Sequence, residues 1–197
     1  MGVMVSLRFG RVLSLTIAGF AAASLVSCGM EATGPAWVAP SPIPAAATSA
    51  VARPARITSA CKLLPASAVI KLLGGTSQSK LAAREEPADM TSNGNVWRTC
   101  VYGRDGKEPF ALAIGVLPKR ADTAKVTIDA AAKTGGSSAK RISGLGADAV
   151  AYVDGSDRVV MAVVPFGTEL RAVMFSAPTI VPQDKLVDVA RHVIDQI

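Results

Sequence analysis

The sequence predicts an α+β domain in which an antiparallel sheet of about five strands is flanked by helices. Segments with strand or helical periodicity follow one another in the order helix, two strands, helix, three strands, helix. Two of the connections between the later strands are short enough for antiparallel hairpins. A chain of 197 residues is also long enough to bury one hydrophobic core.

The first helix is predicted after Cys61, because Pro65 suits a first helical turn and apolar residues then recur at helical spacing. Gly74-Gly75 ends this helix. Residues 76–95 are rich in polar and helix-breaking residues, and we predict that they form a long loop. A loop of that length is uncommon unless it is functional or disordered.

Strands are predicted at residues 96–102 and 110–117, with Trp97 and Cys100 at the buried or bonded positions of the first one. Residues 119–133 form a helix with a small-residue face, which implies close packing. Three more strands follow at 149–153, 158–165 and 169–175. Pro182 opens a last helix whose apolar face is expected to lie across the sheet, with Leu186, Val189, Val193, Ile194 and Ile197 on that face.

The amino-terminal region has the anatomy of a signal peptide, with Arg8 and Arg11 before the uncharged run 12–27. This run is shorter than the about 20 apolar residues that a transmembrane helix needs. Leu25-Val26-Ser27-Cys28 closes the run and resembles a bacterial lipobox. The resemblance implies cleavage before Cys28 and acylation of its thiol; the alternative is an ordinary buried or unpaired thiol.

Residues 1–27 are therefore predicted as a lipoprotein signal peptide and 28–56 as a Pro/Ala-rich tether, because such a composition buries too little apolar surface to fold. The domain would occupy 57–197. The anchor at Cys28 places the protein on the extracytoplasmic face of the cell membrane. The formal net charge of +6 includes Arg8 and Arg11, and no basic run is interleaved with aromatic residues, so no nucleic-acid partner is predicted.

Three cysteines become two once Cys28 carries lipid, and outside the cytoplasm we expect Cys61 to form a disulfide with Cys100. The bond would stabilise the fold by about 4 kcal/mol in the chain-entropy model. A redox or metal site is the alternative. The sequence has no CxxC and one histidine, so no metal and no cofactor is predicted.

No catalytic residue is predicted. Residues 144–149 match GxGxxA, but a strand pattern follows, whereas a dinucleotide-binding turn opens a helix. His192 lies near the end of the last helix, where a cation favours the helix dipole, and a surface or capping role is expected. The pair Glu85-Glu86 falls in the predicted loop, and adjacency alone does not place two carboxylates on one substrate.

Several short motifs are similar to those of actinobacterial lipoproteins of the DUF3558 type. They are Cys61-Lys62-Leu63-Leu64, the helix end Leu73-Gly74, Cys100-Val101-Tyr102, and Ile142-Ser143-Gly144-Leu145-Gly146 before a strand that carries a tyrosine. The resemblance covers about residues 57–197 and implies a Mog1/PsbP-like fold, a sheet flanked by helices. It implies no established catalysis.

The function predicted from these features is that of a membrane-anchored lipoprotein whose non-enzymatic domain binds an envelope protein or ligand through the sheet face or residues 76–95. An alternative is a lipid or small-molecule carrier or sensor, with an apolar pocket between the 119–133 helix and the sheet. A small envelope hydrolase is a third, weaker alternative. The sequence does not specify an oligomeric state.

Overall fold

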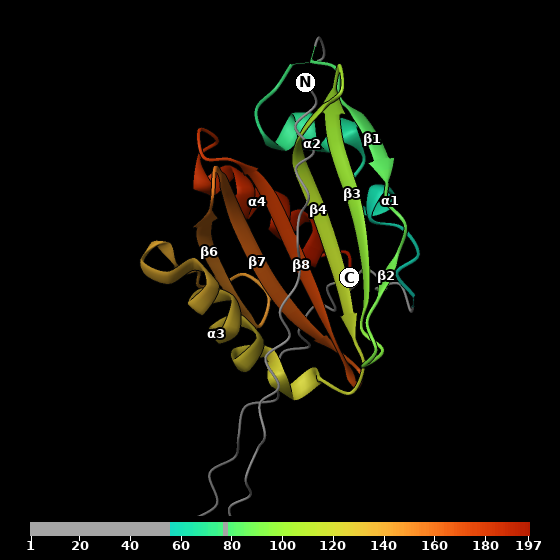
Figure 1. Ribbon diagram of the computed structural model, residues 1–197, viewed down its shortest axis with the longest axis vertical. Coiled ribbons are helices and arrows are strands. Elements are labelled where there is room, and N and C mark those ends of the chain that lie inside the picture. The colour runs from blue at the N-terminus through green and yellow to red at the C-terminus, as the bar shows by residue number, and fades with distance from the viewer. Residues whose placement is uncertain (1–55, 77–78) are drawn as a thin grey trace, which may run out of the picture. The chain divides into compact units, whose positions relative to one another are not determined.

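The computed structural model describes residues 56–76 and 79–197, which belong to one compact unit (Figure 1). An antiparallel sheet of eight strands runs in the order β1-β3-β4-β8-β7-β6-β5, and β2 also pairs with β3. Four α-helices and two short 3-10 turns complete the fold. The elements are α1 (Ala60–Leu63), α2 (Ala66–Leu72), β1 (Ala82–Glu85), β2 (Asp89–Met90), β3 (Val96–Arg104), β4 (Lys107–Leu117), α3 (Ala124–Gly135), β5 (Lys140–Arg141), β6 (Asp148–Asp154), β7 (Asp157–Phe166), β8 (Glu169–Pro178) and α4 (Gln183–Ile194).

The predicted α+β architecture and all five predicted strands are confirmed, but the sheet has three further strands. The five predicted strands are β3, β4, β6, β7 and β8, each slightly longer than predicted. The two expected hairpins are present, because Asp154 pairs with Asp157 and Phe166 pairs with Glu169.

The prediction of one long loop at residues 76–95 is wrong. Residues 82–85 form β1 and residues 89–90 form β2, and both strands pair with the outer edge of β3. All four residues of β1 are exposed, so no burial contrast produces an alternating pattern in the sequence. The partner strand determines this pairing, and local propensity does not reveal it.

The first predicted helix is divided into two at Leu64-Pro65. Proline disfavours the helical region for the residue before it. Leu64 accordingly adopts φ −133° and ψ 86°, and Pro65 becomes the N-cap of α2. The chain therefore turns between α1 and α2, and the buried Leu64 side chain enters the core at that turn.

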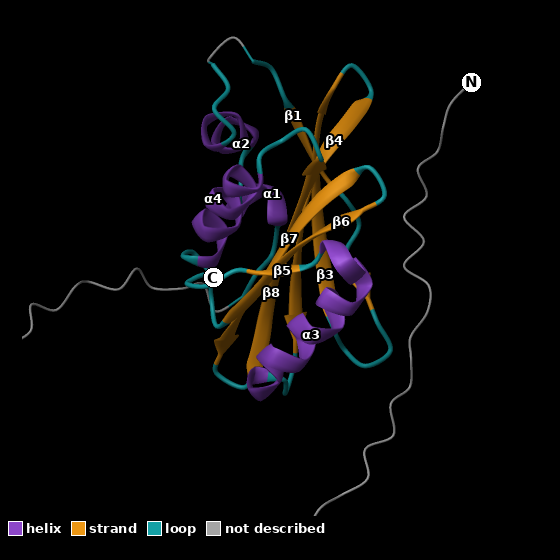
Figure 2. Ribbon diagram, turned by 90° about the vertical axis from the view of Figure 1, so that its left-hand side faces the viewer, coloured by secondary structure: helices purple, strands orange, loops and turns teal. Residues whose placement is uncertain are grey.

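The helices lie on both sides of the sheet but cover the two faces unequally (Figure 2). We name the face against which α1, α2 and α4 pack the closed face. Its core is continuous across the sheet and holds fully buried side chains from β3, β4, β7, β8 and α4, among them Tyr102, Leu112, Ile114, Val160, Phe175, Val189 and Val193. As predicted, the last helix lies against the sheet with its apolar side buried.

On the opposite face, α3 packs over β6 and β7. The predicted small-residue side of this helix, Ala124, Ala131 and Ala132, packs around the buried Ile128. A Cβ on Gly135 would lie 2.3 Å from the Cβ of Tyr152, so the helix end touches β6 directly. The end of α3 therefore packs against Tyr152 with no room for a larger side chain at Gly135.

The segment before β6 is a structural turn, as predicted. Gly146 has φ +61°, and a Cβ there would lie 2.4 Å from the Val163 carbonyl oxygen, so only glycine fits. The next N–H, that of Ala147, donates to the same carbonyl at 2.8 Å. A strand follows this turn, so the chain has no helix N-terminus here for a pyrophosphate.

The closed face also holds one buried charged residue, Arg171 on β8. Its Nε donates to the Glu169 carboxylate at 2.8 Å, and its guanidinium carbon lies 3.4 Å from the centroid of the Phe166 ring. A buried guanidinium needs such partners, because desolvating an unpaired charge is costly.

Candidate functional site

Half of one sheet face has no described helix over it. On the α3 side of the sheet, the helix lies over β6 and β7, and the strands β8, β4 and β3 continue the sheet beyond it (Figure 1). We name this region the open face. It consists of Trp97, Thr99, Val101, Ala111, Ala113, Met174 and Ser176, all of which are partly exposed.

Strand register places these side chains in rows across the sheet. Thr99 pairs with Ala113, which pairs with Met174. In the next row, Val101 pairs with Ala111, which pairs with Ser176. Directly paired residues of antiparallel strands point to the same side of the sheet. Most side chains of the open face are therefore short and extend little above the backbone of the sheet.

Trp97 lies at one end of the open face. A Cβ on its paired residue Gly115 would lie 2.8 Å from the indole ring, so the ring lies directly over the glycine backbone. Trp97 and Met174 also pack against the core beneath α3. Trp97 and Cys100, the two positions predicted to be buried or bonded, lie on opposite faces of the sheet, because they are an odd number of residues apart.

The outer rim of the open face is polar. Arg84 of β1 donates to Glu108 through Nε at 3.0 Å and Nη2 at 2.8 Å, and to Glu86 at 3.2 Å. Hydrogen bonding to Glu108 raises the pKa of Arg84, and the bond from Arg84 lowers the pKa of Glu108. All three side chains are exposed, so these ion pairs orient charge along the rim but contribute little stability.

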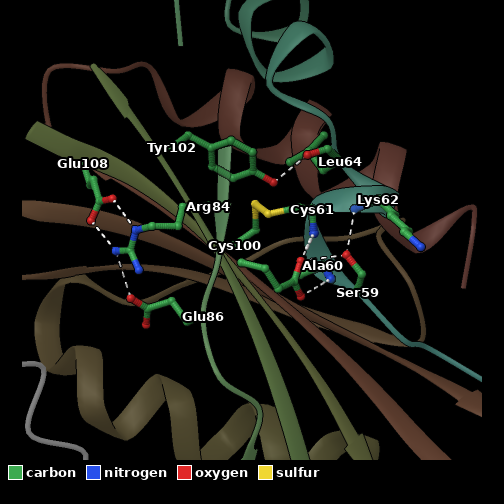
Figure 3. The surroundings of a disulfide bond; sticks show 11 residues. Ser59, Ala60, Cys61, Lys62, Leu64, Arg84, Glu86, Cys100, Tyr102 and Glu108 are labelled. Carbon is green, nitrogen blue, oxygen red and sulfur yellow. Dashed lines mark hydrogen bonds and ion pairs between the residues drawn. A yellow bond between two sulfur atoms is a disulfide. The ribbon is translucent and has the colours of Figure 1, made fainter. Parts of the chain in front are cut away.

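On the closed face, the predicted disulfide is present and joins α1 to the sheet (Figure 3). Cys61 is the second residue of α1, and Cys100 is buried on β3. Close by, the buried Tyr102 hydroxyl donates to the Leu64 carbonyl at 2.6 Å. Burial, together with the charge of Glu85, raises the pKa of Tyr102, so the phenol stays protonated and keeps this hydrogen bond.

Glu85 makes a third connection between α1 and the sheet, after the disulfide and the Tyr102 hydrogen bond. Its carboxylate accepts hydrogen bonds from the Ser59 hydroxyl at 2.7 Å, the Ala60 N–H at 2.8 Å and the Cys61 N–H at 2.9 Å. Burial alone raises the pKa of Glu85, but these three hydrogen bonds and the charge of Arg98 lower it below its usual value of 4.5. The carboxylate thus satisfies N–H groups at the start of α1, as a capping side chain does.

Glu85 and Glu86 are adjacent carboxylates in the segment for which the sequence predicts a loop. The structure gives the two carboxylates separate partners: Glu85 binds the start of α1, whereas Glu86 binds Arg84. The sulfur atoms of Cys61 and Cys100 lie within 4.8 Å of each other and of a Glu85 oxygen. Both sulfurs are consumed by the disulfide, so this cluster offers no thiolate to a metal ion.

The remaining predicted positions are distributed as follows. His192 lies exposed in the last turn of α4, where its surroundings are those of a surface residue. Cys28, the signal peptide 1–27 and the tether up to residue 55 lie outside the described residues. Sequence reasoning missed the open face; the small residues at alternate positions of 99–101 and 111–113 were a signal for it.

Comparisons of this chain with family models, curated proteins and solved structures find no match. The resemblance to DUF3558-type lipoproteins therefore stays a prediction. Among residues 56–76 and 79–197, no helix is both long and apolar enough to cross a membrane.

Proposed function

We propose that this protein is a membrane-anchored, extracytoplasmic lipoprotein whose domain is a non-enzymatic binding module for an envelope protein. The observation that carries the proposal is the open face: a half-sheet of small side chains, with Trp97 and Met174 at its border, over which no described helix lies. Exposed apolar surface bordered by polar residues is typical of interaction sites.

The partner that fits this surface best is a helix with an apolar side. α3 already packs on the neighbouring strands through small residues of its own, and sheet floors of small side chains let a helix approach closely. A partner helix beside α3 would complete the layer on this side of the sheet. Trp97 at the edge of the surface is the residue type that most often anchors such interfaces.

The rim formed by Arg84, Glu86 and Glu108 supports a defined orientation of that partner. Charges at the edge of an interface contribute more to orientation and association rate than to affinity. The rim holds both signs of charge within one ion-pair network. A complementary pair on the partner would select one direction of the helix along β3 and β4.

The proposed anchor at Cys28 places the domain at the outer surface of the membrane, where the partner would also lie. The test of this part is the intact mass of protein extracted from membranes. A chain that begins at Cys28 and carries acyl mass supports the anchor, whereas a chain that retains Met1 and has no acyl mass contradicts it.

The docking surface is tested by photo-crosslinking in cells that express the full chain. A photoreactive phenylalanine analogue replaces Thr99 or Ala113 on the open face, and Val126 or Ala88 in control variants. Both control positions are exposed and lie off the open face. We expect a discrete adduct with one envelope protein at the two open-face positions and none at the controls.

A purified partner identified in this way should then bind the wild-type chain and lose at least tenfold in affinity for Ala113→Glu, because a carboxylate would be buried against apolar surface. Ala88→Glu is the matched control and should bind as the wild type does. An adduct made only with a second copy of this chain would replace the proposed partner by self-association. Equal adducts at all four positions would remove the open face as the docking surface.

A further inference from the structure

Two hollows flank α2 on the closed side of the molecule, away from the open face. The larger, of about 780 Å³, lies between α2 and the chain that follows it. The smaller, of about 370 Å³, lies between α2 and α4. Ser67 and Lys71, one helical turn apart, line both hollows. The larger one has a volume within the range of ligand sites.

The lining of the hollows carries positive charge without an acidic counterpart. Lys71 and Lys80 line the larger hollow and Lys71 also lines the smaller one, whereas no carboxylate of the described residues lines either. Among the described residues, neither lysine forms an ion pair. Arg84, Lys125 and Arg141, by contrast, each have a carboxylate partner. The positive charge at α2 is therefore available to an anion.

Hydroxyl groups and apolar side chains complete the lining. Ser67, Thr76 and Ser79 offer hydrogen-bond donors beside the two lysines. Ile70 and Leu81 give the larger hollow apolar walls, and Ala68 and Leu72 do the same for the smaller one. A Cβ on Gly75 would lie 2.9 Å from the Ile70 side chain, so the backbone at Gly75 lies close to the helix at one side of the larger hollow.

From this combination we propose that the hollows beside α2 bind a phospholipid with an anionic headgroup. The phosphate is held by Lys71 and Lys80 together with the neighbouring hydroxyls, because ammonium and hydroxyl donors suit phosphate oxygens. The start of an acyl chain lies along Ile70, Leu81 and Leu72. This location differs from the pocket expected between the 119–133 helix and the sheet, and it does not depend on the open face.

The test measures binding of soluble short-chain lipids to the full chain by calorimetry. Dihexanoyl phosphatidylglycerol is compared with dihexanoyl phosphatidylcholine and with glycerol 3-phosphate, each below the concentration at which it forms micelles. We expect phosphatidylglycerol to bind more tightly than either of the other two. Phosphatidylcholine has no net charge, and glycerol 3-phosphate has no acyl chain.

Variants then assign the binding to the hollows. Lys71→Glu/Lys80→Glu should bind phosphatidylglycerol about tenfold more weakly, since two favourable charge contacts become repulsive. Lys107→Glu/Lys133→Glu makes the same change in charge at two exposed lysines elsewhere and should bind as the wild type does. Ser67→Trp should also weaken binding, because Ser67 lines both hollows and a larger side chain would fill them.

The predicted signal peptide is present in every variant, so its own affinity for lipid cancels in the comparison. Thermal unfolding midpoints equal to that of the wild type exclude misfolding as the cause of lost binding. Equal affinity for the two lipids, or equal loss in both double variants, would overturn the proposal. Binding of glycerol 3-phosphate as tight as that of the lipid would show a phosphate site without a lipid and would overturn it as well.

Discussion

The two faces of the sheet differ in how deeply their side chains are buried. On the closed face, one row across the sheet contains Cys100, Leu112, Phe175 and Val160, all fully buried beneath helices. One residue along, the row on the other side contains Thr99, Ala113 and Met174, all partly exposed. The same strands therefore build a closed core on one side and, on the other, a surface that no described helix covers.

This difference indicates that stability depends mainly on one face of the sheet and binding on the other. The disulfide, the Tyr102 hydroxyl and the Glu85 carboxylate all fasten α1 and the turn after it to the closed face. No comparable fastening holds the described residues of the open face, where the rim ion pairs are exposed. Substitutions on the closed face should therefore cost stability, and those on the open face should cost binding.

The largest effect expected is that of removing the Cys61–Cys100 bond. The double variant Cys61→Ser/Cys100→Ser should lose about 4 kcal/mol in free energy of unfolding, because the bond closes a long loop in the unfolded chain. Urea denaturation at fixed pH measures the loss. Amide exchange should show α1 and α2 opening before β7 and β8; uniform opening of the whole domain would contradict the assignment of the bond to the closed-face junction.

Neighbouring residues of β8 give a direct comparison of the faces. Phe175→Ala should cost about 3–5 kcal/mol, because the ring is fully buried and leaves a cavity. Met174→Ala, which removes a partly exposed side chain on the other side of the same strand, should cost about 1 kcal/mol. Urea midpoints measure both. Equal costs would mean that the open face is covered in solution.

The hydroxyl groups of the two buried tyrosines should give a smaller difference in stability between the two faces. Tyr102→Phe should cost about 1–3 kcal/mol, because the Leu64 carbonyl loses its 2.6 Å hydrogen bond inside the core. Tyr152→Phe is the matched control on the α3 side, where the hydroxyl meets only the Met174 sulfur at 3.9 Å, and should cost less than about 0.5 kcal/mol. Similar losses would show that the hydroxyl of Tyr102 is not a fastening.

The smallest effect expected is a dependence of stability on pH through Glu85. Its pKa is lower in the folded protein than its usual value of 4.5, so its contribution is full above pH 4.5 and is lost as pH falls through the folded-state pKa. The difference in urea midpoint between wild type and Glu85→Gln should be constant above that pH and shrink below it. A difference that grows on acidification would reverse the sign and contradict the prediction.

Salt separates Glu85 from the rim carboxylate Glu108, whose pKa is also lowered. The Glu85 contribution should persist in about 1 M salt, because two backbone N–H groups donate to its carboxylate at short range. The contribution of Glu108, measured with Glu108→Gln, should nearly vanish there, because it rests on an exposed ion pair. Equal salt sensitivity of the two contributions would contradict this difference between Glu85 and Glu108.

The sequence by itself determined the long elements and the pairing of the two cysteines within the domain. β3 alternates, β6, β7 and β8 are largely apolar, and α3 and α4 have helical periodicity, because each of these elements buries side chains in the core of at least one face. With Cys28 assigned to acylation, only one pairing of the remaining cysteines was left, and it is present. Such patterns can be found in the local sequence because they follow from which residues are buried.

Only the tertiary structure decided the short strands, the division of α1 from α2 and the difference between the faces. β1, β2 and β5 are exposed and owe their pairing to partner strands, β3 for β1 and β2, and β6 for β5. Glu85 became a capping carboxylate because β1 brings it to α1, and Trp97 became a border of the open face because α3 stops over β7. The physical reason is that periodicity tells which side chains avoid water, whereas the partner that covers them depends on where the rest of the chain lies.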